Sequence, residues 1–241
     1  MEVAITWLTE RPVAEDAGKS EAAGHDDPSA PVFFLSYWRP DPAKHGAGQP
    51  REPNRFVMQF FDELSENVNN LIGSMPGRDP GFLDVARGGG ELWERQLLHA
   101  AGTCQVFICL LSTPYLTGSQ WCAREWDLFT RREVRPRHSL AQPYETAVVP
   151  VLWTPLSTPL PPVVSDVNLF VPTRLRDDYR AEYQAEGLLG LLRTGQRLVF
   201  DTVVWRIAQR VVDIRHNYWV EPLHLPGSGE LRTDFERRAD V

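Results

Sequence analysis

The 241-residue chain contains a continuous apolar run, Val106–Leu111, followed closely by a helix-forming segment, and no other feature constrains the fold as strongly. The run has the length of one strand and no polar interruption, which is typical of a parallel strand covered on both faces. A turn is predicted at Ser112–Pro114, and Ser119 is a suitable cap for a helix that contains Trp121 and Glu125. Because ligands of open α/β sheets bind outside the carboxyl ends of the strands, Glu125 is expected to face the site.

Further segments alternate between strand and helix patterns. Short apolar runs predict three more strands, at Pro31–Tyr37, Gly81–Asp84 and Ala147–Trp153. Apolar residues at helical spacing predict further helices, at Arg55–Ile72, Glu91–Ala101, Tyr179–Leu192 and Leu198–Ile214. Strands that alternate with helices favour parallel pairing through right-handed crossovers. We therefore predict an α/β, flavodoxin-like three-layer fold with a central parallel sheet, followed by C-terminal helices.

The sequence divides into three parts. Residues 1–30 are rich in Ala, Gly, Asp, Glu and Ser and are predicted to form an N-terminal arm that is largely disordered. Residues 31–216 form the α/β domain with its C-terminal helices. Within it, Arg39–Asn54 contains four prolines and several glycines, which predicts a long exposed loop. Residues 217–241 are predicted to be a charged tail.

Composition excludes several kinds of partner. The net charge of -7 and the scattered arginines argue against nucleic acid. No apolar run approaches the roughly 20 residues that span a bilayer, and the polar, acidic start does not resemble a signal peptide. The cysteines are odd in number and lie in apolar segments, which favours reduced thiols inside a cell: Cys104, Cys109 and Cys122. We expect a cytoplasmic protein without a membrane or nucleic-acid partner.

Three groups of residues, in order and in spacing, resemble the Toll/interleukin-1 receptor (TIR) domain. They are the first strand, Phe33–Tyr37, then Phe82–Asp84 leading through a Gly-rich loop to Trp93, and finally the motif from Leu110 to Glu125. A narrower resemblance is to the TIR-like proteins encoded with bacterial FxSxx peptide-maturation systems, and it rests on Val148–Trp153, Leu160–Val163 and Ala185–Leu192. The TIR resemblance also implies a flavodoxin-like fold.

The resemblance implies that Glu125 is the catalytic residue. In catalytic TIR domains, the glutamate of the Trp-Cys-x-x-Glu motif lies beside the ribose of NAD+ and is required to break the bond to nicotinamide. Nicotinamide leaves as a neutral molecule, so the reaction needs a carboxylate near the developing oxocarbenium ion and no general acid. NAD+ is thus the expected substrate, and no cofactor or metal is expected, because the six histidines show no metal-like clustering. The structural alternative is a glutamate on an exposed helix face.

The expected substrate-binding residues follow the predicted strands: Ser36, Tyr37, Trp38, Arg39, Asp84, Arg87, Gly88, Gly89, Trp93, Ser119, Trp121 and Cys122. By resemblance, the loop after the first strand holds nicotinamide, with Trp38 or Tyr37 stacked on the cationic ring. Arg39 is placed to meet the pyrophosphate. The glycines occupy the position of the family's BB loop, where they allow positive φ angles. Trp121 and Cys122 are predicted to be core residues rather than reacting groups. Other structural alternatives stay open: Tyr37 as core, Arg39 as a solvated side chain and the glycines as a plain turn.

Two functions compete. The first is a TIR-domain NAD+ nucleosidase, a hydrolase or cyclase of bacterial immune or toxic signalling that self-associates through TIR surfaces and is activated by assembly. The second is a non-catalytic adaptor that recruits a protein partner or activator, possibly in a peptide-maturation system. Retention of Glu125 favours the first. A nucleoside deoxyribosyltransferase-like enzyme also uses a glutamate on a related fold, but the Trp-Cys-x-x-Glu context does not suit it. Whether the product is linear or cyclic ADP-ribose stays open.

Overall fold

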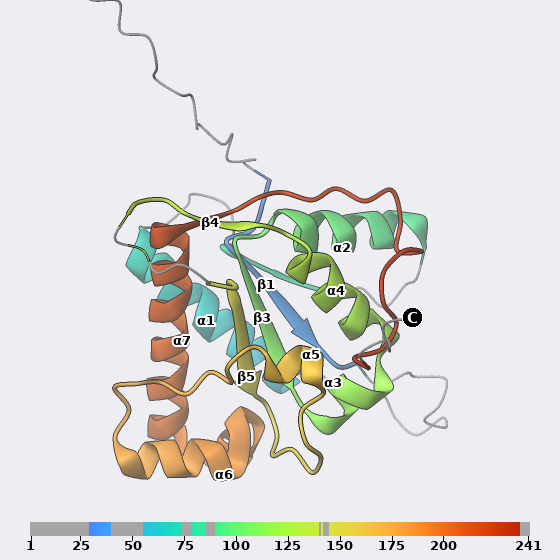
Figure 1. Cartoon of the computed structure of the whole chain (residues 1–241). Coiled ribbons are helices and arrows are strands. Elements are labelled where there is room, and N and C mark those ends of the chain that lie inside the picture. The colour runs from blue at the N-terminus through green and yellow to red at the C-terminus, as the bar shows by residue number, and fades with distance from the viewer. Residues whose placement is uncertain are drawn as a thin grey trace, which may run out of the picture.

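The computed structural model describes residues 29–39, 55–73, 79–84, 90–139, 141 and 145–236. At its centre lies a four-stranded parallel sheet in the order β2-β1-β3-β5, made of β1 (Phe33–Tyr37), β2 (Gly81–Leu83), β3 (Val106–Leu111) and β5 (Val148–Leu152) (Figure 1). The predicted α/β fold, flavodoxin-like with a central parallel sheet, is confirmed. The expected N-terminal arm up to residue 28 and most of the loop Arg39–Asn54 lie outside the described residues.

Helices cover both faces of the sheet (Figure 1). α1 (Arg55–Ile72) and α7 (Arg197–Asn217) pack together on one face, and α2 (Glu91–Thr103) and α4 (Gln120–Thr130) pack together on the other. α6 (Asp177–Arg193) packs against α7. The shorter elements are α3 (Thr113–Gly118), α5 (Pro162–Ser165), β4 (Val134–Pro136) and β6 (Tyr218–Val220), and the two strands among them pair antiparallel. None of the helices in the described ranges has the length and apolar character to cross a membrane.

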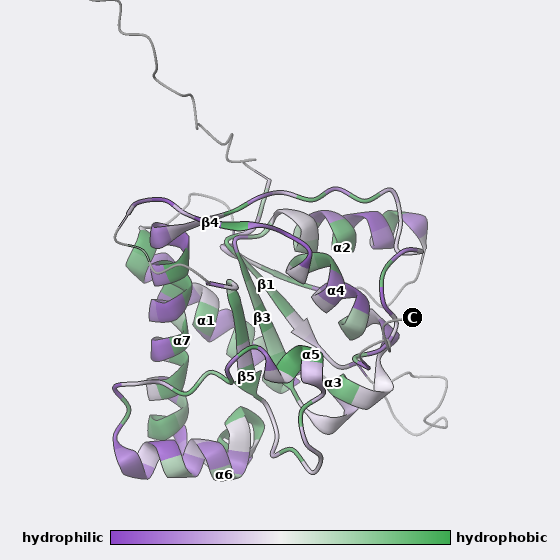
Figure 2. Ribbon diagram, viewed as in Figure 1, coloured by the Kyte–Doolittle hydropathy of each residue, from purple (hydrophilic) through white to green (hydrophobic). Residues whose placement is uncertain are grey.

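Aromatic side chains form the core because successive residues of a strand point to opposite faces. Every residue of β1, β3 and β5 is buried, and these strands are the hydrophobic centre of Figure 2. On the α4 side, the Phe34 ring lies 5.4 Å from that of Phe82 and 5.6 Å from that of Phe107. On the α1 side, Phe33 lies 5.7 Å from Phe61. The sheet is therefore a double-sided core, as the uninterrupted apolar runs predict.

The strand order places a topological switch point between β1 and β3. The chain passes from β1 to β2 on one side and then returns to β3 on the other side of β1. Parallel register sets Ser36 opposite Cys109 and Tyr37 opposite Leu110, so both strands end at the same edge of the sheet. Crevices at such a point are the usual ligand sites of this fold class.

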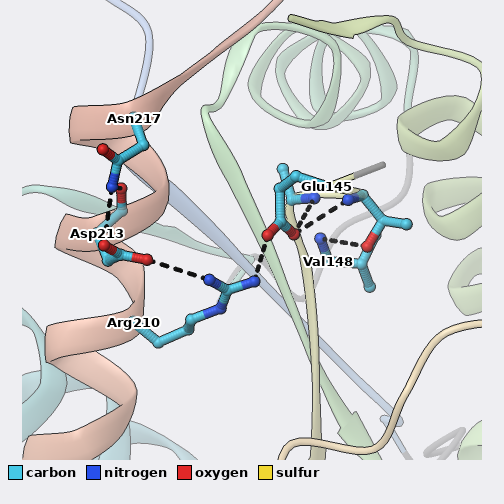
Figure 3. A network of polar contacts seen from close by, with 7 residues as sticks. Glu145, Val148, Arg210, Asp213 and Asn217 are labelled. Atoms are coloured by element: carbon cyan, nitrogen blue, oxygen red, sulfur yellow. Dashed lines mark hydrogen bonds and ion pairs between the residues drawn. The ribbon is translucent and has the colours of Figure 1, made fainter. Parts of the chain in front are cut away.

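Glu145 fixes the entry into β5 (Figure 3). Its Oε1 accepts hydrogen bonds from the backbone N–H of Thr146 at 3.0 Å and of Ala147 at 2.9 Å. Its Oε2 pairs with Arg210 of α7, and Arg210 also pairs with Asp213 at 3.2 Å. Ala147 is fully buried at a φ of 54°, a conformation that non-glycine residues rarely adopt. The Glu145 carboxylate therefore holds a strained residue at the start of the strand and ties it to α7.

The segment expected to be a charged tail is instead packed onto the domain as far as residue 236, where the described part of the chain ends. Its first residues form β6, and residues 221–236, here called the C-terminal strap, run past α2 and α4 toward α3 (Figure 1). Leu231 and Phe235 are only 5% and 3% exposed. Phe235 lies 6.0 Å from the Trp126 ring and 5.6 Å from the Tyr115 ring. Isolated apolar residues among charged ones gave no periodic signal, which is why the prediction differs from the structure for this segment.

A buried arginine joins the strap to the rest of the fold. Arg132 is 6% exposed and lies at the end of α4. Its guanidinium donates to the backbone oxygens of Ala101 at 2.9 Å, Glu221 at 2.9 Å and Val220 at 3.2 Å. Burial lowers its pKa from the ordinary value, although an arginine remains charged. The cation thus satisfies the carbonyl groups at the end of α2 and at the start of the strap.

Candidate functional site

Glu125 lies at the carboxyl ends of β1 and β3. Ser119 caps α4 as the sequence predicts, because its Oγ accepts a hydrogen bond from the Cys122 N–H at 3.1 Å. With Ser119 as the cap, α4 begins at Gln120, so that Glu125 falls within its second turn and faces the sheet. The glutamate is 9% exposed. The alternative of an exposed helix face is therefore excluded.

Two hydroxyl groups connect to the Glu125 carboxyl. Ser36 Oγ donates to Glu125 Oε2 at 2.5 Å, and the Tyr115 hydroxyl lies 2.9 Å from the same Ser36 Oγ. Tyr115 was missed by the sequence prediction because it lies in α3, where a turn was expected. The signal was present: Ser112 caps α3 by accepting from the Tyr115 N–H at 3.2 Å, and a proline stands in the first turn.

Burial makes Glu125 a weaker acid than an exposed glutamate. Loss of hydration raises the pKa of its carboxyl to about 8, against the lowering effect of the Ser36 hydrogen bond. The Asp84 charge raises this pKa further, and the Arg39 charge lowers it. Glu125 is therefore mostly protonated at pH 7 in the unliganded protein. A perturbed carboxyl of this kind, at the switch point of the sheet, marks a candidate active site.

Asp84 gathers several predicted site residues at the end of β2. Its carboxylate forms an ion pair with Arg39 and accepts a hydrogen bond from Trp93 Nε1 at 2.9 Å. Its backbone oxygen accepts from the Tyr37 hydroxyl at 2.9 Å and from Arg39 at 2.8 Å. Tyr37 is buried, and desolvation raises its pKa to about 12, so it is a neutral packing residue near neutral pH. The arrangement joins the end of β1, the end of β2 and the first turns of α2.

Partly buried tryptophans surround this edge of the sheet. Trp93 and Trp121 form an edge-to-face pair. Their ring centroids are 4.7 Å apart at an interplanar angle of 77°. The Arg124 guanidinium lies 4.8 Å from the centroid of the Trp121 ring. Trp38 Nε1 would lie 3.4 Å from a Cβ atom added at Gly118, so Trp38 borders α3. Trp121 was predicted to be a core residue; it is only partly buried and packs against the core.

Cys122 is a core thiol. It is 2% exposed and donates to the backbone oxygen of Tyr37 at 3.5 Å. Burial, together with the neighbouring Glu125, raises the pKa of this thiol well above its ordinary value. A thiol that stays protonated is a poor nucleophile. The chemistry of the site therefore depends on oxygen groups.

Three predicted site residues, Arg87, Gly88 and Gly89, lie outside the described residues. The third glycine of the triplet, Gly90, precedes α2 at a φ of 151°. Within the described part of the chain, no group of three or more His, Cys, Asp or Glu residues is arranged to hold a metal ion. The fold places the following residues in contact with one another at this edge of the sheet: Ser36, Tyr37, Arg39, Asp84, Trp93, Tyr115, Ser119, Trp121, Cys122 and Glu125.

A separate hollow of about 560 Å³ lies on another side of α4. Trp126 and Phe235 line it, and both are buried. Its Asp127 carboxylate is paired with Arg131 at 2.7 Å and with Arg232 at 3.6 Å. The lining also includes Glu145, Asp166, Asp234 and Arg132, so four carboxyl groups face three arginines and the hollow offers no clear preference for a charged ligand.

Comparison of the chain with models of known protein families finds no match, and no curated protein or solved structure matches it either. The function must therefore be argued from the geometry and chemistry of the site. The buried carboxyl of Glu125 and its two hydroxyl neighbours are the best-defined chemical group there.

Proposed function

We propose that this protein is an NAD+ nucleosidase of the TIR type, in which Glu125 acts on the bond between ribose and nicotinamide. The observation that carries the proposal is the Glu125 carboxyl, buried at the switch point of the sheet and hydrogen-bonded by Ser36 at 2.5 Å. A carboxylate held in this way can stabilise a cation that develops beside it, because the surrounding protein has a low effective dielectric constant.

In the proposed reaction, the C1′–N1 bond of NAD+ breaks and both of its electrons stay with the nicotinamide nitrogen. The pyridinium becomes neutral nicotinamide, and positive charge appears on the ribose ring. The Glu125 carboxylate faces this oxocarbenium ion. Water then adds to C1′ and releases a proton, which gives ADP-ribose; attack by another atom of the same ADP-ribose gives a cyclic product.

Substrate binding and the protonation of Glu125 are coupled in this mechanism. The pKa of about 8 means that the unliganded carboxyl is mostly neutral at pH 7. A pyridinium beside it favours the ionised form, because an opposite charge within a few ångströms lowers the pKa of a carboxyl. Binding of NAD+ therefore promotes loss of the Glu125 proton and so favours the ionised form that acts in the reaction.

The aromatic and cationic residues have roles that follow from their positions. Trp38, Trp93 and Trp121 are partly buried and can offer ring surface to the pyridinium. Arg39 is the proposed partner of the pyrophosphate. Its side chain is 29% exposed and is paired with Asp84, so the substrate must share or displace that pair.

The TIR resemblance extends the proposal to assembly and biological role. We place the activity in the cytoplasm, as part of bacterial immune or toxic signalling that is switched on by self-association. A neighbouring subunit or another protein activator would complete the site around Glu125. No resident cofactor is required, because NAD+ is the substrate.

The adaptor remains the second candidate, and one observation favours it. Glu125 is 9% exposed and already bonded to Ser36, so the site is closed in the unliganded chain. In an adaptor, the same carboxyl would be a structural group, and the protein would recruit a partner without consuming NAD+.

Nicotinamide release separates the two functions. The full chain is incubated with NAD+ over a range of protein concentrations, and nicotinamide is measured by chromatography. Glu125→Gln should reduce the rate about a hundredfold or more, because it keeps the shape and removes the charge. Glu133→Gln is the matched control, since this glutamate is exposed and pairs only with an exposed arginine in the described structure. Equal rates for the wild-type protein and Glu125→Gln would overturn the proposal.

A further inference from the structure

A hydroxyl that lies outside the predicted site reaches Glu125 through Ser36. The Tyr115 hydroxyl is 2.9 Å from Ser36 Oγ, and Ser36 Oγ donates to Glu125 Oε2 at 2.5 Å. We propose that Tyr115 is a positioning residue: it donates to Ser36 and thereby directs the Ser36 proton onto the Glu125 carboxylate. The inference rests on the proposed function in taking Glu125 as the reacting carboxylate.

The direction of the hydrogen bonds follows from the proton count. An ionised carboxylate only accepts hydrogen bonds, so the single proton of Ser36 must point toward Glu125. The second contact of Ser36 must then be one that it accepts, which makes Tyr115 the donor. Burial raises the pKa of Tyr115 well above its ordinary value, so the phenol keeps the proton it donates. Ser36 and Tyr115 are 1% and 0% exposed, so neither hydroxyl is in contact with bulk water.

The two hydrogen bonds from Tyr115 to Ser36 and from Ser36 to Glu125 are here called the relay. Three separate elements hold the relay in place. Ser36 belongs to β1, Tyr115 to the short helix α3 and Glu125 to α4. α3 is fixed at its start by Ser112, which caps it, and the Tyr115 ring lies 5.6 Å from the ring of Phe235 in the C-terminal strap. A side chain that is packed on all sides keeps its hydroxyl in one direction.

The other titratable or charged groups that face Glu125 come from β1, the loop after it, the end of β2 and α4. They are Tyr37, Arg39, Asp84 and Cys122. Arg39 and Asp84 act on Glu125 through charge and in opposite directions. Tyr37 and Cys122 have pKa values raised by burial and stay neutral near pH 7. Tyr115 differs from all four, because its effect passes through the Ser36 hydroxyl.

The test is the pKa of Glu125 in the unliganded protein, read from the carboxyl carbon signal of 13C-glutamate by NMR, with Glu125→Gln to assign that signal. Tyr115→Phe keeps the ring and removes the hydroxyl. It should raise the pKa of Glu125 by about half a unit to one unit, the equivalent of one modest hydrogen bond. Ser36→Ala should raise it at least as much, and adding Tyr115→Phe to Ser36→Ala should change nothing further.

Tyr183→Phe is the matched control. Tyr183 is also fully buried, and its hydroxyl accepts from the Leu152 N–H at 2.9 Å, away from Glu125. Loss of either hydroxyl should lower the melting temperature, but only Tyr115→Phe should move the Glu125 titration. An unchanged titration in Tyr115→Phe, or an equal shift in the Ser36→Ala background, would overturn the inference.

Because the titration uses no substrate, it is independent of the activity. If the protein never releases nicotinamide but Tyr115→Phe shifts the Glu125 titration, the relay is supported and the proposed function is refuted. If the protein releases nicotinamide but Tyr115→Phe leaves the Glu125 titration unchanged, the proposed function is supported and the relay is refuted.

Discussion

Ser36 Oγ and Glu125 Oε2 are 2.5 Å apart, although one residue lies in a strand and the other lies on a helix 89 positions later in the chain. The contact spans the switch point of the sheet, between β1 and the layer formed by α2 and α4. It brings a hydroxyl donor to a carboxyl that burial would otherwise leave without water or protein partners.

The stability of the protein should fall as pH rises between about 4.5 and 8. The pKa of Glu125 is raised to about 8 in the folded state from its ordinary value of 4.5. The folded protein therefore binds more protons in this window, and its Glu125-linked stability is full below the unfolded pKa and lost as pH rises through the folded pKa. The slope from this group is about 1.4 kcal/mol per pH unit. Urea unfolding across the window should show this slope, and Glu125→Gln should remove it.

The rate of nicotinamide release at low NAD+ should rise with pH through about 8, because the ionised Glu125 is the active form. At saturating NAD+ the midpoint should lie lower, since the bound pyridinium favours the carboxylate. Initial rates from pH 5.5 to 9.5 at both concentrations measure the two midpoints. A rate that falls over this range would contradict the assignment of Glu125 as a carboxylate catalyst.

Arg39→Ala and Asp84→Asn should move the Glu125 titration in opposite directions. Arg39 lowers the pKa of Glu125 and Asp84 raises it. Removal of the arginine should therefore raise the midpoint, and neutralisation of the aspartate should lower it. Arg135→Ala is the control, because this exposed arginine pairs with Glu133 and Glu221. Shifts of the same sign in the two site variants would show that the charges do not act as described.

Phe235→Ala should destabilise the fold by about 3 kcal/mol, the lower end of the range for a buried aromatic residue. Phe235 is 3% exposed and contacts the rings of Tyr115 and Trp126. Its neighbour Glu236 is exposed, so Glu236→Ala should have little effect on the free energy of unfolding. Denaturant titrations of the two variants decide whether the strap is packed in solution; equal, small effects would mean that it is a tail.

Arg132→Leu should destabilise by about 3 kcal/mol, since it removes a buried, charged donor that serves three backbone oxygens at once. Those groups are the backbone oxygens of Ala101, Val220 and Glu221. Arg135→Leu offers a comparison at an exposed arginine nearby in sequence. Similar unfolding midpoints for the two variants would contradict the role given to Arg132.

Long apolar patterns predicted the fold well. Val106–Leu111 and Arg55–Ile72 were predicted with the bounds that β3 and α1 have, because one is an uninterrupted strand-length run and the other repeats at helical spacing over several turns. α3 has six residues, too few for any period to appear. Leu231 and Phe235 are single apolar residues in a charged segment, and only their distant ring partners explain their burial.

The candidate site was predicted in part. The position of Glu125 followed from the strand and the helix cap, both of which are local features. Its protonation did not, because it depends on Ser36, Arg39 and Asp84, which come from distant parts of the sequence. Tyr115 was missed for the same reason: its hydroxyl acquires a role only when α3 brings it beside β1.

The C-terminal strap also sets an order of events during synthesis. Phe235 covers Tyr115, Tyr115 meets Ser36, and Ser36 meets Glu125. A nascent chain emerges from its N-terminal end, so β1 and α4 are available long before the strap. The packing around the rings of Tyr115 and Trp126 is therefore incomplete until residue 235 has been made and has emerged from the ribosome.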